Sequence, residues 1–147
     1  MPDVAHGTQF QNELIATWNG LGKLAWAYRF DDARDLFGLN KRMVRDFPKP
    51  ADLLLVYNGW HSLCECKATK NVKGFSISMM ERAQLSAATR MVAAKGNYHV
   101  AVKRMSDGIV HFVPASLVLT EQGVLSWERL APYQWKGLLP PCLISPT

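Results

Sequence analysis

Cysteine is scarce in this chain, with three residues among 147. A small, odd number of cysteines disfavours the disulfide framework of a small secreted domain and favours a reduced compartment. Cys64 and Cys66 form a C-x-C pair, but no second Cys or His pair follows at the spacing of a structural zinc site. We therefore expect neither a disulfide framework nor bound zinc.

Long apolar runs are also missing, because no stretch approaches the roughly 20 residues that a membrane-spanning helix needs. The N-terminus lacks the basic and then apolar layout of a signal peptide, and there are no repeats, low-complexity tracts or linkers. With 48% hydrophobic and 20% charged residues, the composition is that of a globular protein. We expect a soluble cytoplasmic protein of bacterial, archaeal or phage origin, without a membrane partner and with residues 1–147 in one domain.

Acidic residues are outnumbered by basic ones, which gives a net charge of +5. The bias is strongest between residues 67 and 104, where a single acid, Glu81, stands among eight basic residues. These are Lys67, Lys70, Lys73, Arg82, Arg90, Lys95, Lys103 and Arg104. A solvated face also produces such runs, but nucleic-acid binding is the commoner reason for so strong a bias. The charge distribution therefore favours a polyanionic partner.

Hydrophobic spacing and turn residues predict an α/β fold, with a mixed central β-sheet flanked by helices. Two capping-box patterns, Thr8 with Gln11 and Ser78 with Glu81, mark the helix starts. The expected elements are a helix over about 8–19, a strand over 23–30, a hairpin of 52–57 with 60–67, a helix ending at 95, and a hairpin of 98–105 with 109–113. The proline-containing tail is expected to be irregular.

The clearest local signal is Asn58-Gly59 between two apolar runs, which predicts a two-residue hairpin turn. Counting outwards from this turn places Asp52 opposite Glu65, on one face and with Cβ atoms about 4.5–5.5 Å apart. Lys67 lies two residues further along that face. Two carboxylates this close repel each other unless a cation lies between them, and oxygen ligands suit a hard ion such as Mg²⁺. The register therefore predicts a metal site.

A D…E-x-K pattern alone is weak, because such acids are more often edge charges that the lysine neutralises. Three features favour the metal site here: the opposed register, a further acid on the preceding helix, and the basic run that follows. The same register turns Cys64 and Cys66 into the apolar layer on the other face.

These residues together resemble the PD-(D/E)XK nuclease signature, and in particular Holliday-junction resolvases of the RecU and archaeal Hjc type. The resemblance covers roughly residues 7–114. It rests on Gly7 to Glu13 of the first helix, Pro50-Ala51-Asp52, Glu65-Cys66-Lys67, Thr69, Phe75, Ile77 and Gln84. Ala51 separates the proline from the aspartate, the long basic N-terminal extension of RecU is absent, and residues 31–49 align with nothing in the family.

The resemblance implies a restriction-endonuclease-like core and a homodimer that nicks two strands of a four-way DNA junction symmetrically. Asp52 and Glu65 would bind Mg²⁺, which Mn²⁺ is expected to replace, with help from Glu13 and the Cys66 backbone carbonyl. Lys67 would orient the attacking water or hold a phosphate oxygen. Gln84 would belong to the catalytic site.

Several polar and basic residues are candidates for DNA contact, although a loop-shaping or solvated role is the alternative for each. Those near the motif are Thr69, Lys70, Lys73 and Ser76; those in the unaligned segment are Arg34, Lys41, Arg42 and Arg45, followed by Lys49. That segment is the best candidate for reading the shape of a junction. Trp127, Tyr133 and Trp135 are able to stack on bases, but core or dimer packing is the favoured use.

The leading hypothesis is a Mg²⁺-dependent endonuclease that resolves Holliday junctions. A restriction or repair nuclease acting on duplex or flap DNA is an alternative within the same fold. A DNA-binding module with a vestigial site is an alternative of another class, which the intact acidic pair and lysine disfavour.

Overall fold

The computed structural model describes residues 4–30 and 49–141, with side chains from residue 6 onwards. Its elements, with η for 3-10 helices, are α1 Val4–Asn19, β1 Ala25–Arg29, β2 Leu53–Tyr57, β3 Trp60–Thr69, β4 Gly74–Ser76, η1 Ile77–Met79, α4 Arg82–Ala93, β5 Tyr98–Arg104, β6 Val110–Pro114, α5 Ala115–Thr120, β7 Val124–Ser126, α6 Trp127–Leu130, η2 Ala131–Tyr133 and η3 Lys136–Leu138. No helix in this described part is long and apolar enough to cross a membrane.

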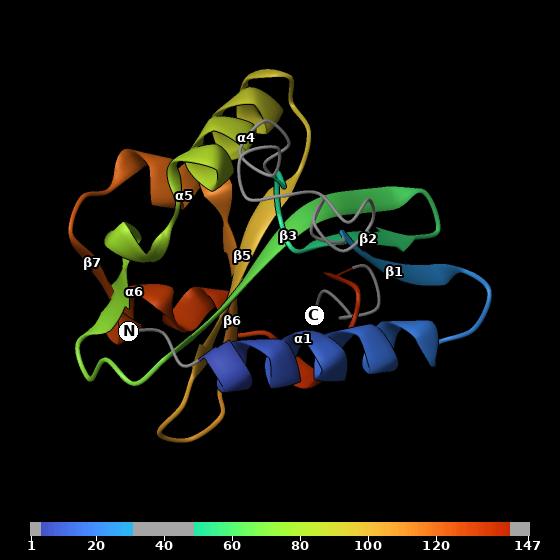
Figure 1. Cartoon of the computed structure of the whole chain (residues 1–147), viewed down its shortest axis with the longest axis horizontal. Helices are drawn as coiled ribbons and strands as arrows, with labels where there is room; N and C mark the ends of the chain where they lie inside the picture. The colour runs from blue at the N-terminus through green and yellow to red at the C-terminus, as the bar shows by residue number, and fades with distance from the viewer. Residues whose placement is uncertain (1–3, 31–48, 142–147) are drawn as a thin grey trace, which may run out of the picture.

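Five strands form one sheet in the order β1-β2-β3-β5-β6, and β4 pairs with β7 in a small second sheet. β3 and β5 are parallel, whereas the other neighbours in the large sheet are antiparallel. Figure 1 shows α1 on one side of the strands, with α4 and α5 on the other. The predicted α/β class, a mixed sheet flanked by helices, is therefore confirmed.

The hairpin that places the acids has the predicted turn. Asn58 and Gly59 have φ angles of 45° and 87°, which are the positive values that a type I′ turn requires. Pairing runs from Tyr57 with Trp60 out to Leu53 with Cys64. One further step along this register brings Asp52, the residue before β2, opposite Glu65.

Apolar side chains fill both sides of the sheet. Phe10, Leu14 and Trp18 of α1 are fully buried and belong to one cluster with Cys64 and Cys66. The predicted helical stripe and the orientation of the two thiols are thus confirmed. Hydrogen bonding to Cys64 and burial raise the pKa of the Cys66 thiol, so Cys66 remains a neutral packing residue. A second cluster joins β5 and β6 to α4, α5 and β7.

Three details differ from the predicted elements. α1 begins at Val4, so Thr8 and Gln11 lie inside the helix and do not cap it. The second helix begins at Arg82 with Glu81 as its N-cap, because residues 77–79 form a separate 3-10 turn. Beyond residue 114, where the sequence predicts no regular element, α5, β7 and α6 form.

The contribution of His99 to stability is expected to fall as pH drops from about 6.5 to 4, because the half-buried His99 ring is neutral in the folded chain. Its ring stacks on Phe112 with 4.0 Å between centroids, its Nδ1 lies 2.7 Å from Ser62 Oγ, and burial lowers its pKa from 6.5 to about 4. Between these values the unfolded chain binds a proton that the folded chain does not. Urea unfolding at pH 7 and pH 4.5 measures the difference.

The variant His99→Gln lacks the titrating group, so lowering the pH from 7 to 4.5 should change its stability less unfavourably than that of wild type. His61→Gln, which alters an exposed histidine on β3, should show the wild-type change. Equal changes in wild type and His99→Gln would contradict the assignment.

Candidate active site

A cleft lies between the start of α1, the hairpin and the start of α4. It brings together four predicted site residues, Asp52, Glu65, Lys67 and Gln84, with the backbone of Cys66 at its wall. The remaining lining residues are Gly7, Thr8, Gln11, Lys49, Ala68, Met79 and Glu81. Residues that are far apart in the sequence therefore converge at one place on the sheet.

The two carboxylates are held by backbone amides of the paired chain segments. The Asp52 backbone N–H donates to Glu65 Oε2 at 3.1 Å, and the Cys66 N–H donates to Asp52 Oδ2 at 3.0 Å. Each acid is thus anchored on the backbone of the opposite segment. This exchange follows from the hairpin register, and it fixes both acids at the wall of the cleft.

Lysines provide the positive charge at the cleft. Lys67 Nζ lies 3.2 Å from Glu65 Oε1, and Lys49 Nζ lies 3.6 Å from Asp52 Oδ1. These charges do not fully compensate Glu65, whose side chain is only 3% exposed. Burial and the negative charge of Asp52 raise the pKa of Glu65 from 4.5 to about 8, against the opposing effect of Lys67.

Gln84 connects the acids to α4. Its Nε2 donates to Glu65 Oε1 at 2.6 Å, while its Oε1 accepts the Glu81 backbone N–H at 2.9 Å. The second contact is half of a capping box at the start of the helix. The side chain is buried, and both its amide nitrogen and its amide oxygen are hydrogen-bonded, unlike those of an ordinary surface glutamine.

Tyr98 supports the same arrangement from β5. Its hydroxyl donates to the Pro50 carbonyl at 2.7 Å, two residues before Asp52. Burial and the nearby charge of Glu65 raise the pKa of this hydroxyl, so it stays protonated as a donor. No local sequence pattern indicates this contact, because it joins residues 48 positions apart.

The donor set suits a hard divalent cation. Two carboxylates converge in a mostly buried place, and Mg²⁺ is normally bound by one or two carboxylates while keeping several waters. In the described ranges there is no group of three or more His, Cys, Asp and Glu side chains arranged to hold a metal. Asp52 and Glu65 therefore fit an ion whose remaining ligands are water, backbone or substrate oxygens.

Glu13 does not lie in the cleft. Its side chain is exposed and pairs with Lys103 at 3.2 Å, whereas Gln11, two residues earlier on α1, lines the cleft. Two helix residues that are two positions apart point in different directions, since each residue turns the chain by about 100°. α1 therefore contributes Gly7, Thr8 and Gln11 to the lining of the cleft, and a metal-ligand role for Glu13 stays a prediction.

Among the described residues, the candidates for DNA binding after Lys67 are not part of the cleft lining. Thr69 shapes the loop after β3, because its Oγ1 accepts the Asn71 N–H at 3.1 Å. Ser76 contacts Ser78 at 2.8 Å between hydroxyls, and Lys73 is exposed in the same loop as Lys70. Lys49, by contrast, lines the cleft. The predicted contacts Arg34, Lys41, Arg42 and Arg45 lie outside the described residues.

Comparison with known proteins finds a solved structure of similar fold. No family model matches the chain, and no curated protein matches it by sequence. The structure is similar to that of Hjc, a Holliday junction resolvase from the archaeal hyperthermophile Archaeoglobus fulgidus, with a TM-score of 0.55 and 17% identity over 88% of this chain and 90% of that one. At this identity the likeness establishes the fold: the chain has the fold of Hjc.

Proposed function

We propose that this chain is a metal-dependent DNA endonuclease that resolves four-way junctions. The convergence of Asp52, Glu65 and Lys67 in one cleft is the observation that carries the proposal. The choice of a four-way junction as substrate is supported by the fold, because Hjc, which is similar over nearly its whole length, is a Holliday junction resolvase. The net charge of +5 agrees with a polyanionic substrate.

Each group at the cleft has a role in this proposal. Asp52 and Glu65 would hold Mg²⁺ or Mn²⁺, with the Cys66 carbonyl as a further ligand. Such an ion, when bound, lowers the pKa of water and stabilises charge on a scissile phosphate. Lys67, 3.2 Å from Glu65, would orient the attacking water or hold a phosphate oxygen. Gln84 keeps Glu65 in the required orientation.

Cleavage of labelled DNA tests the activity. A four-way junction, a linear duplex of the same sequence and a flap are incubated with the protein in Mg²⁺, in Mn²⁺ or in EDTA. We expect paired nicks at symmetric positions of the junction with either metal, and none in EDTA. Equal cutting of duplex or flap would favour the restriction or repair alternative. Binding without cutting in either metal would favour the vestigial DNA-binding module.

The proposal includes a homodimer, because two symmetric nicks need two active sites related by a two-fold axis. Sedimentation at micromolar concentration is expected to give twice the 16.5 kDa mass of the chain. A monomer that still nicks both strands of a junction would contradict this part.

Glu13→Gln is expected to leave the Mg²⁺ concentration for half-maximal cleavage within about threefold of wild type. The reason is that Glu13 pairs with Lys103 outside the cleft, so its loss resembles the loss of an exposed ion pair. Titration of Mg²⁺ in the junction assay provides the measurement. A shift above tenfold would restore Glu13 as a metal ligand.

A further inference from the structure

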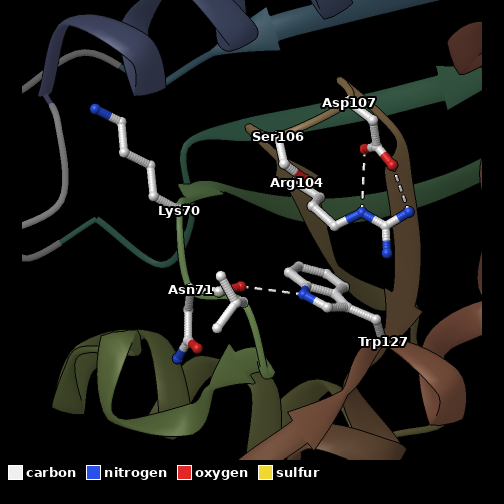
Figure 2. A pocket seen from close by; sticks show the side chains of 7 residues that line it. Lys70, Asn71, Arg104, Ser106, Asp107 and Trp127 are labelled. Carbon is white, nitrogen blue, oxygen red and sulfur yellow. Dashed lines mark hydrogen bonds and ion pairs between the residues drawn. The ribbon is translucent and has the colours of Figure 1, made fainter.

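A second hollow lies at the end of β3, beyond the carboxylate cleft. Three segments form it: the loop after β3, the end of β5 with the turn that follows it, and the first residue of α6. Figure 2 shows the side chains that these segments contribute. Those used below are Lys70, Asn71, Arg104, Ser106, Asp107 and Trp127.

Hydrogen bonds fix these segments to one another. The Trp127 indole Nε1 donates to the Asn71 carbonyl at 3.0 Å, and the Trp127 backbone N–H donates to the Lys73 carbonyl at 3.4 Å. The turn is attached to the end of β3 by the Met105 N–H, which donates to the Thr69 carbonyl at 2.9 Å. The walls of the hollow are therefore built before any ligand arrives.

The guanidinium of Arg104 is held in one orientation. Its Nε and Nη2 donate to the two carboxylate oxygens of Asp107 at 3.1 Å and 2.6 Å. The guanidinium carbon lies over the Trp127 ring, 5.1 Å from the centroid. The third guanidinium nitrogen is turned away from Asp107 in Figure 2. A guanidinium fixed in this way is suited to a phosphate oxygen, since little side-chain entropy remains to be lost.

The position and charge of the hollow relate it to the cleft. Lys70 follows Lys67 by three residues, a distance of about 10 Å along an extended chain. Lys70 and Arg104 together outweigh the charge of Asp107, so the hollow is positive. A strand of DNA whose scissile phosphate lies beside Lys67 would therefore continue towards it.

We propose that this hollow binds a backbone phosphate of the DNA strand, close to the phosphate that is cleaved. Arg104 supplies a charged donor and Ser106 a hydroxyl, while Lys70, whose side chain is directed away from Arg104 in Figure 2, adds positive charge at the rim. Trp127 supports the guanidinium. Asp107 positions the guanidinium. The inference rests on the proposed DNA-cleaving function and assigns a second contact on the same strand.

Removing charge from the protein and from the DNA tests this proposal. Junctions carrying a single neutral methylphosphonate, placed in turn at each position near the cut, are bound to wild type and to Arg104→Ala without divalent metal. We expect one position outside the scissile phosphate to weaken wild-type binding about tenfold. Arg104→Ala should lose a similar factor on unmodified DNA and nothing further at that position. Arg129→Ala, which breaks an exposed pair with Glu121, is the matched control and should keep the wild-type pattern.

Salt dependence gives a second measurement. Loss of one phosphate contact should lower the slope of log affinity against log salt by about 0.9 for Arg104→Ala and for Lys70→Ala. Lys70 is exposed, so its variant tests the hollow if Arg104→Ala unfolds. Undiminished methylphosphonate sensitivity and unchanged slopes in the variants would overturn the inference. If the wild-type protein binds no DNA, both this inference and the proposed function are wrong. If the wild-type protein cleaves DNA but Arg104→Ala and Lys70→Ala bind it as the wild type does, only the phosphate site in the hollow is wrong.

Discussion

Glu65→Gln is expected to lower Mg²⁺-dependent cleavage of a four-way junction by a factor on the order of 10²–10³, with DNA binding kept or tightened. The substitution removes a charged ligand from a place where Asp52 alone cannot neutralise a divalent ion. When metal is bound, it also removes a negative charge beside the proposed phosphate. Asp52→Asn should behave in the same way, for the same reason.

The measurement is single-turnover cleavage, accompanied by binding and by thermal unfolding of each variant. Glu128→Gln is the matched control, since it makes the same chemical change at an exposed position of α6. Lys67→Ala should lose most activity and remain folded. Near wild-type cleavage by either acidic variant would show that the metal assignment is wrong.

Gly74→Ala is expected to lower the free energy of unfolding by about 1–3 kcal/mol. A Cβ at this position would lie 1.9 Å from the Leu125 carbonyl oxygen and 2.8 Å from the Ser126 Cα. Both are backbone atoms of β7, so the clash is relieved only by separating β4 from β7. The loss should appear as a lower midpoint in urea unfolding.

Gly7→Ala is not expected to lower the free energy of unfolding. A Cβ on Gly7 meets no heavy atom within 4 Å, and an alanine inside a helix is better than glycine by about 0.5–1 kcal/mol. Gly7→Ala should therefore be as stable as wild type or more so. An unchanged midpoint for Gly74→Ala would mean that the small sheet adjusts at little cost.

The hairpin and its acids were predictable because the information is local. Two turn residues with positive φ define the register, and the register decides which side chains share a face. Asp52, Glu65 and Lys67 therefore needed no knowledge of the rest of the fold. The buried stripe of α1 followed from its spacing for the same reason.

The parts that escaped prediction depend on contacts between distant segments. β4 and β7 are three residues each and pair across some 50 positions, so neither has a hydrophobic period long enough to detect. The position of Glu13 outside the lining of the cleft has another cause. A sequence motif places an acid on a helix, but only the docking of α1 on the sheet decides which side of the helix meets the cleft.

Gln84 belongs both to the cap of a helix and to the candidate active site. One amide group closes the first turn of α4 and also holds the carboxylate of Glu65. Helix ends open and close on a local equilibrium of low free energy. Each opening of this first turn would release Glu65 from its amide partner, so the fraying of α4 would set the fraction of molecules in which the proposed catalytic groups are assembled at any moment.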